Sequence, residues 1–204
     1  MSQVMEQLRT DHLNMARLIS VLDLEMRTLE GAGTPDFELM LEILDYALNY
    51  PELCHHPKED LVYRKLMERD PVSSEVVEDL LEEHKKLTMM TKEFAELLRG
   101  ITLDGEVPRE KLGALGRAYM AFGRRHIERE EITVFPLAEK ALKDEDWVEI
   151  DAAISGDDPL FGSEVADHYL ALYNSITALP PASGESNSCS PGIALDSFRS
   201  TQRT

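Results

Sequence analysis

Two short segments of the chain repeat the pattern His-x-x-x-Glu, in which a histidine is followed four residues later by a glutamate. The first pair is His55 with Glu59, and the second is His126 with Glu130. Residues four apart lie on one face of an α-helix, so an imidazole and a carboxylate at this spacing can reach one metal ion. Charged pairs at this spacing are also common on solvated helix faces, so one pair alone is weak evidence.

The whole pattern is duplicated, because each pair is preceded by one more histidine. His12 precedes His55, and His84 precedes His126, by nearly the same number of residues. A single histidine on an apolar helix face is usually a hydrogen-bonded core residue. Six polar groups buried together would be costly without mutual pairing or a metal ion, so the duplication favours a metal site. The predicted ligands are His12, His55, Glu59, His84, His126 and Glu130.

Four imidazoles and two carboxylates fit a dinuclear metal site. Imidazole suits iron, zinc, copper and nickel, whereas carboxylate oxygens suit harder ions, so the mixture favours non-haem iron or manganese. Glu59 and Glu130 could each bridge the two ions, with two histidines on each ion. Open positions would then remain for oxygen, nitric oxide or peroxide. A structural module with zinc or with a single metal ion is the alternative.

Acidic residues stand next to the predicted ligands in the sequence. Glu131 and Asp60, each one residue past a ligand glutamate, are expected either to accept hydrogen bonds from ligand imidazoles or to be solvated. Asp11 and Glu83, each just before a ligand histidine, are expected to be surface charges. Four tyrosines could also line the site: Tyr46, Tyr50, Tyr63 and Tyr119.

Four long helical segments must position these residues. Apolar residues recur at helical spacing over residues 3–30, 36–67, 75–99 and 109–142. Pro51 and Pro57 predict a break or kink beside His55, and Pro136 predicts one after Glu130, since proline lacks a backbone donor and collides with the preceding turn. Long helices with short loops favour an all-α fold, an antiparallel up-down four-helix bundle with extra C-terminal helices.

The chain divides into three expected parts. Residues 1–142 form the metal-binding bundle. Residues 143–179 add helices packed on the bundle, at 144–155 and 163–178. Residues 180–204 are rich in Pro, Ser and Gly and are expected to be disordered.

Composition restricts the partners and the location. Acids outnumber bases by 39 to 21 in 204 residues, for a net charge of −18, and such a surface repels nucleic acid and anionic membranes. No apolar stretch reaches membrane-spanning length and no signal peptide is visible, so a cytoplasmic location is expected. Cys54 and Cys189 form no Cys-x-x-Cys pair. Cys54 is expected to be a buried structural thiol and His168 a surface residue.

Four segments, LRTDHLNMARLISVLDLE, HHPKEDLVY, LLEEHKKL and GRRHIEREEITVFPLAEKAL, resemble the four helices of a hemerythrin-like (HHE cation-binding) domain. The resemblance covers residues 3–142. It implies that the six predicted ligands occupy the metal-ligand positions of the family. It also implies two non-haem iron ions, with an oxo or hydroxo bridge as an option, that bind oxygen or related small molecules.

The sequence departs from the oxygen-carrying hemerythrins at two positions. Those proteins have a His-x-x-x-His pair on the third helix, where this chain has His84 and Thr88, and they have aspartate where this chain has Glu130. His56 is a secondary candidate for a fifth imidazole, although it lies about 100° from His55 on a regular helix. These departures favour the broader bacterial-type group, which includes sensors and proteins of iron, nitric oxide or redox stress.

Two functions therefore remain open. The first is a binding or sensing protein whose di-iron centre reversibly binds a small diatomic ligand, oxygen or nitric oxide. The second is an enzyme that reduces oxygen, peroxide or nitric oxide at the same site. Residues after 142 could serve as a lid, as the surface of a homodimer or as a partner site.

Overall fold

The structure, a computed structural model, describes residues 2–31, 33–103, 107–154 and 158–178. Every regular element within these ranges is helical, which confirms the predicted all-α class. The expected disordered tail, residues 180–204, lies outside the described residues, and so does Cys189. None of the described helices is long and apolar enough to cross a membrane.

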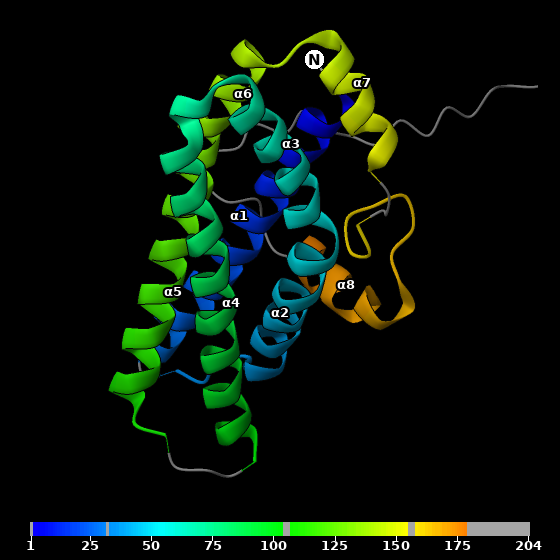
Figure 1. The fold of residues 1–204 in the computed structure, drawn as a ribbon. Helices are drawn as coiled ribbons and strands as arrows, with labels where there is room; N and C mark the ends of the chain where they lie inside the picture. The colour runs from blue at the N-terminus through cyan, green and yellow to red at the C-terminus, as the bar shows by residue number, and fades with distance from the viewer. Residues whose placement is uncertain (1, 32, 104–106, 155–157, 179–204) are drawn as a thin grey trace, which may run out of the picture.

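Helical rods lie side by side and form the body of the protein (Figure 1). The helix α1 packs on α5, α2 packs on α4, and α4 packs on α5. In chain order, the rods are α1 (Gln3–Glu30); α2 (Phe37–Tyr50), η1 (Pro51–His55) and α3 (His56–Arg69); α4 (Ser74–Thr102), preceded by the 3₁₀ turn η2 (Pro71–Ser73); and α5 (Arg109–Arg129), η3 (Glu130–Val134) and α6 (Phe135–Ala141).

The irregular turns predicted from the prolines are π-helical turns. In η1 the N–H of His56 donates to the carbonyl of Pro51, and in η3 the N–H of Phe135 donates to the carbonyl of Glu130, each five residues earlier. A proline follows each turn, Pro57 in one rod and Pro136 in the other. Such π turns change the direction in which neighbouring side chains point, and here both lie at predicted ligands.

The apolar core is divided into two clusters along the rods. The first, which we call the lower cluster, contains the second half of α1 together with α2 and the parts of α4 and α5 near their shared loop, with Leu22, Met40 and Phe94 fully buried. The upper cluster contains the start of α1, α3, the start of α4 and α6, with Leu8 and Phe135 fully buried. The predicted ligand positions fall between the two clusters in every rod.

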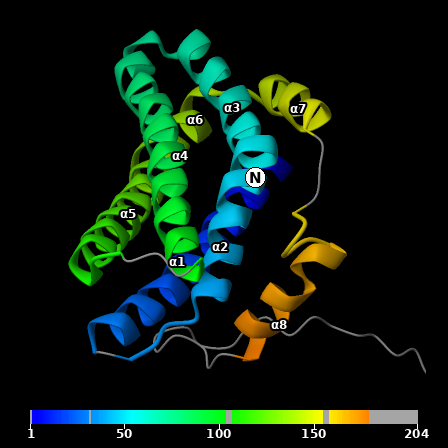
Figure 2. The same ribbon diagram turned by 90° about the horizontal axis from the view of Figure 1, so that it is seen from below.

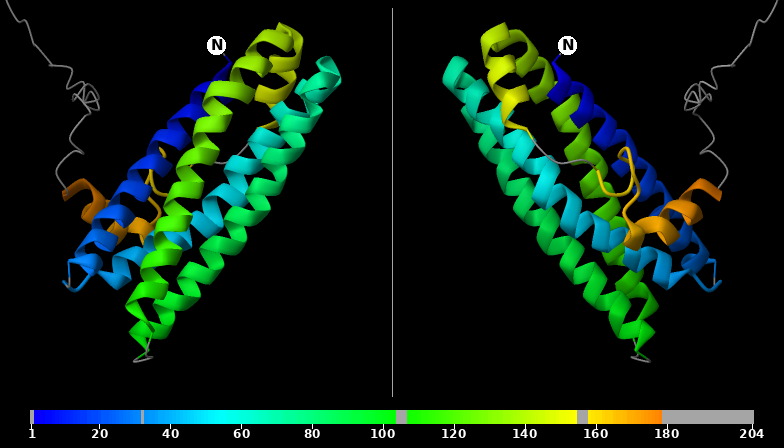
Figure 3. Two further views of the ribbon diagram at one scale, coloured as in Figure 1. Left: turned by 90° about the vertical axis from the view of Figure 1, so that its left-hand side faces the viewer. Right: turned by 90° about the vertical axis from the view of Figure 1, so that its right-hand side faces the viewer.

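Two further helices lie outside the four rods (Figure 3). The helix α7 (Asp144–Ala153) contacts α1 and α3, and α8 (Leu170–Ala178) contacts α2. Seen from below, α8 lies on the side of the molecule away from α5 (Figure 2). The helix α8 adds apolar side chains, among them Leu172 and Ile176, to the lower cluster.

The last helix is shorter than predicted. A helix was expected over residues 163–178, but regular structure begins with a 3₁₀ turn, η4 (Asp167–Tyr169), and α8 starts only at Leu170. The preceding turn has its own hydrogen bonds, because the Asp158 carboxylate accepts the N–H groups of Leu160 and Phe161, and the carbonyl of Pro159 accepts the N–H of Ala166. These bonds hold the backbone in a turn before the helix begins.

Candidate metal centre

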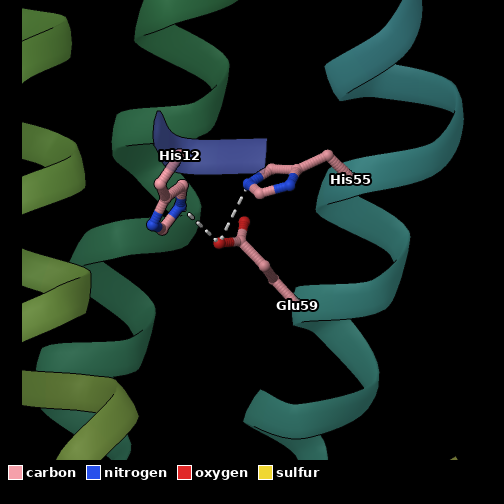
Figure 4. Close-up of side chains that lie close together, drawn as sticks. All are labelled: His12, His55 and Glu59. Atoms are coloured by element: carbon pink, nitrogen blue, oxygen red, sulfur yellow. Dashed lines mark ion pairs between the residues drawn. The ribbon is translucent and has the colours of Figure 1, made fainter. Parts of the chain in front are cut away.

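The six predicted ligands lie together in the interior, between the two apolar clusters. His12 comes from α1, His84 from α4, and the two His-x-x-x-Glu pairs come from the rods that contain the π turns. Every one of the six is buried: the most exposed, His84, is 7% exposed, and both glutamates are 0% exposed. Figure 4 shows that His12 and His55 both point toward Glu59.

Three imidazoles surround the carboxylate of Glu59. The Nε2 atoms of His55 and His12 lie 3.2 Å and 3.5 Å from Oε1 of Glu59. The Nε2 atom of His84 lies 3.3 Å from Oε2. Because these rings come from three different rods, Glu59 makes contacts that connect the three rods.

The carboxylate of Glu130 has an equivalent environment. The Nε2 atoms of His12, His84 and His126 lie 3.2 Å, 3.3 Å and 3.3 Å from its oxygens. In addition, the hydroxyl of Tyr63 donates to Oε1 at 2.6 Å. His12 and His84 therefore face both glutamates, whereas His55 and His126 each face the glutamate of their own pair.

Several inward-facing atoms make no hydrogen bond within the described residues. They are His12 Nε2, both carboxylate oxygens of Glu59 and Oε2 of Glu130. Ring nitrogens lie within ion-pair distance of them, but the angles do not suit a hydrogen bond. Buried polar atoms are nearly always paired, so a group of unpaired donors and acceptors that face one another indicates a missing common partner. A metal ion bound by imidazole nitrogen and carboxylate oxygen fits this donor set.

The outer nitrogens of three rings are held by acids. The Nδ1 atom of His12 lies 2.8 Å from Glu131, which confirms the expectation that Glu131 contacts a ligand imidazole. With a carboxylate on Nδ1, the proton of the neutral ring stays on that nitrogen and the lone pair of Nε2 faces the interior. This orientation is the one that a metal ligand requires. Within the described residues, Asp60 makes no hydrogen bond to these rings, and its carbonyl accepts one from Arg64.

Asp11 and Glu83 are not the surface charges that were expected. Asp11 is 2% exposed, and its carboxylate lies 3.1 Å from Nδ1 of His55. Glu83 is half-buried and lies 2.9 Å from Nδ1 of His126. Each of these acids holds the histidine of a neighbouring rod, a contact that sequence spacing does not show.

A sequence signal for these two acids nevertheless exists. Asp11 directly precedes His12 and Glu83 directly precedes His84, so the duplicated pattern begins with an acid in both halves. In both halves this acid contacts the histidine of the His-x-x-x-Glu pair in the same half. The repeat could have identified both residues as part of the site.

Tyrosines extend the network around the acids. The hydroxyl of Tyr50 donates to Asp11 at 2.9 Å, and the buried ammonium of Lys58 lies 3.3 Å from the same hydroxyl. Tyr63 contacts Glu130, whereas the hydroxyl of Tyr46 donates to Asp158 at 2.9 Å, in the segment outside the rods. Tyr63 therefore contacts a predicted ligand, and Tyr46 and Tyr119 line a cavity beside the cluster.

The imidazoles and carboxylates of the cluster shift one another's pKa values. Burial alone would lower the pKa of His12 and of His84, but close contacts with Glu130 and other carboxylates raise the pKa of His12 well above its ordinary value and that of His84 to about 10. Burial alone would raise the pKa of Glu130, as does the charge of Glu59, but close contacts with His12 and His84 lower it to about 2. The imidazoles and the carboxylates of the cluster therefore favour each other's charged forms.

An apolar cavity of about 80 Å³ adjoins the cluster. Its polar end is formed by His12, His55, His126 and Glu130. The rest extends into the lower cluster between α1, α2, α4 and α5, and is lined mainly by Met15, Ile19, Leu22, Ile43, Leu87 and Ile127. A cavity of this kind can take a small apolar molecule and gives water few partners.

The other two residues singled out in the sequence lie apart from the cluster. Cys54 is a free, half-buried thiol packed against the lower cluster, so it is less buried than expected. His168 is exposed on the 3₁₀ turn η4, as expected of a surface residue.

Comparison with known protein families gives one match. The sequence model described as the hemerythrin HHE cation-binding domain matches residues 3–138, which contain all six residues of the cluster. The comparison with curated proteins gives no match.

The acid on the outer nitrogen of His126 generates a first prediction. In Glu83→Gln the side chain keeps its size but loses the charge that orients the ring. We expect metal affinity to fall about tenfold, at the lower end of what such partners contribute, as measured by titration against a competing chelator. Glu82→Gln, at the neighbouring exposed position, is the control. Equal affinities for the two variants would contradict the role of Glu83.

The pKa of His84 predicts how the stability of the metal-free protein depends on pH. Folding raises this pKa from 6.5 to about 10, so protonation of the ring stabilises the folded state. The stabilisation is complete at pH values below the ordinary pKa, and it is lost as the pH rises through the folded pKa. We expect the melting temperature of the metal-free protein to fall as the pH is raised across this window. The metal-loaded protein should show a weaker dependence, and an unchanged melting temperature without metal would contradict the prediction.

Proposed function

The chain belongs to the hemerythrin HHE cation-binding domain family, and from this membership we propose that the protein holds a non-haem di-iron centre that binds oxygen or nitric oxide in sensing or in a stress response. One observation carries the proposal. The imidazoles and carboxylates face one another with unpaired atoms, while acids hold the outer nitrogens of three rings. Imidazoles and carboxylates arranged in this way support a metal-binding role.

The proposed ligands divide into two groups. His12, His55 and Glu59 each offer a ligand atom within 4.8 Å of the others, and so do His84, His126 and Glu130. Each group would hold one iron ion, and the two glutamates would be shared between the ions. Carboxylate oxygen together with imidazole favours iron over a zinc site, which more often includes thiolate. Iron with an open position supplies the reversible binding of a diatomic molecule.

The residues of the chain supply the conditions for that binding. The acids on Nδ1 keep the rings in one tautomer and one orientation. Tyr63 donates to Glu130 and thereby limits the positions that this carboxylate can take. The apolar cavity supports the proposal for oxygen or nitric oxide, because both ligands are small and nearly apolar and enter such a space without losing hydrogen bonds to water.

The wider architecture is part of the same proposal. We propose that the four rods form an antiparallel up-down bundle over residues 1–142, with residues 143–179 as additional helices packed on it. The contacts of α7 with α1 and α3, and of α8 with α2, support this division. A cytoplasmic location and a homodimer remain predictions.

Measurements of the metal content and of the absorption spectrum test the proposal. The protein is purified without oxygen from cells grown with ample iron, and its iron and zinc are measured before it is exposed to air or to nitric oxide. We expect two iron ions per chain and a reversible change in the spectrum with each gas. Less than one metal ion per chain would overturn the proposal, and zinc in place of iron would favour the structural module.

Turnover separates the binding protein from the enzyme. A di-iron enzyme would consume oxygen, peroxide or nitric oxide continuously when a reductant is supplied. A binding protein would take up one equivalent and then stop. Sustained consumption of oxygen, peroxide or nitric oxide would show that the protein is an enzyme and would overturn the binding role.

The cavity generates a further prediction. Gly123 lines it, and a Cβ atom at this position would lie 3.2 Å from Cδ1 of Ile19. In Gly123→Ala the methyl group should narrow the cavity and slow the association of nitric oxide several-fold, as measured by stopped-flow absorption. The overpacking costs about 1–3 kcal/mol, but alanine favours the helix by about 1 kcal/mol, so the variant should fold.

The control for this variant is Gly100→Ala. A Cβ atom at Gly100 would make only an ordinary contact, 3.7 Å from Cγ2 of Val107, and it lies outside the cavity. Association rates that change equally in both variants would show that the cavity is not the path of the ligand.

A further inference from the structure

We propose that Lys58 raises the reduction potential of the metal centre by balancing the buried negative charge of Asp11, the acid that holds His55. Lys58 is thus a positioning residue, which acts on the centre through Asp11 and His55. The inference rests on the proposed function, because it concerns the redox state of the same centre.

Lys58 is a buried cation on a rod that carries predicted ligands. Its ammonium lies 3.8 Å from Oδ2 of Asp11 and donates to the hydroxyl of Tyr50 at 3.3 Å. It also lies 5.6 Å from the centre of the Tyr50 ring. Lysine is almost never fully buried unless it is paired, because removing its charge from water is costly. The negative charge of Asp11 compensates for this cost.

One carboxylate oxygen receives the contacts of this group. Oδ2 of Asp11 lies 3.1 Å from Nδ1 of His55 and accepts the hydroxyl of Tyr50 at 2.9 Å. Burial and the charge of Asp11 raise the pKa of Tyr50 above its ordinary value, so the phenol stays neutral. The charge of Asp11 is therefore shared between the N–H of His55 on one side and the ammonium of Lys58 on the other.

The π turn explains why Lys58 faces Tyr50. The two residues are eight apart, and side chains at this spacing on a regular α-helix point about 80° apart. The turn η1 between them takes up one additional residue, which brings both side chains to one side of the rod. His56, beside the same turn, instead stacks on the ring of His84, with centroids 3.9 Å apart and planes at 9°.

The other two outer acids also contact a base, but nearer the surface. Arg9 contacts Glu131, and Arg129 contacts Glu83. The side chains of the two arginines are 28% and 31% exposed, compared with 3% for Lys58. Water and salt screen the charges of exposed groups, whereas a charge in the interior acts with little screening. Lys58 is therefore the base of the three with the largest influence on the centre.

The sign of the effect follows from the charges. A positive charge near a metal centre stabilises the reduced state, because that state carries less positive charge. The ammonium also draws on the negative charge of Asp11, so Asp11 accepts the N–H of His55 less strongly and the imidazole remains a neutral ligand. Both effects of Lys58 raise the potential, whereas the charge of Asp11 alone would lower it.

Redox titration of the iron-loaded full chain, followed by absorption, tests the inference. We expect Lys58→Met, which keeps an apolar side chain of similar length, to lower the midpoint potential, and Asp11→Asn to raise it. The double variant loses both charges and should return towards the wild-type potential. Lys65→Met is the control, because it removes a surface ammonium that pairs with Glu149, and it should leave the potential unchanged.

The opposite signs separate an electrostatic role from a structural one. A disturbance of the fold alone would shift the potential of both single variants in the same direction. Shifts of the same sign in Lys58→Met and Asp11→Asn, or an unchanged potential in Lys58→Met, would overturn the inference.

Stability of the metal-free chain gives a second measurement, which holds even where a single variant folds poorly. Each single variant leaves one buried charge without its partner, whereas the double variant leaves neither. We expect the double variant to melt at a higher temperature than both single variants, and a lower melting temperature than both would overturn the charge pair. Failure of the wild-type protein to bind two iron ions would instead overturn the proposed function, and its metal content, measured first, identifies that case.

Discussion

The structure depends on one costly arrangement, the burial of several ionisable groups in the middle of an apolar bundle. Glu59 and Glu130 are completely removed from solvent, and isolated carboxylates in such a place would not stay ionised. They are stabilised only because His12, His55, His84 and His126 converge on them from all four rods. The outer acids extend the same alternation of charge by one more layer. The rods must therefore meet in one register, since a shift of a single residue in any of them would leave a buried charge without its partner.

Much of this arrangement could be predicted from the sequence, because it repeats within the chain. The two His-x-x-x-Glu pairs and the two preceding histidines are visible as a pattern, and the structure brings these six residues together. The prolines near the pairs predicted irregular turns, and both turns are π-helical. Helical periodicity predicted the all-α class and the bounds of α1, which are confirmed.

What the sequence did not show depends on contacts between rods. Asp11 and Glu83 look like ordinary surface acids, because the imidazoles that they bind lie on other helices. The place of His56 depends on the hydrogen bonding of a single turn, which a regular helical wheel misrepresents. The start of α8 was predicted too early, because side-chain bonds of Asp158 hold the preceding turn and apolar periodicity does not record them. Each miss is a case in which a specific tertiary or local polar contact outweighed a periodic signal.

The division of the apolar core into two clusters has a consequence for how the protein folds. The six residues of the predicted site belong to neither cluster. The layer that they form between the clusters is polar and gains little from the hydrophobic effect. A metal ion bound in this layer would connect the helices that carry the lower cluster with those that carry the upper cluster. Chains without metal would then open more often at this layer and be exposed to proteolysis.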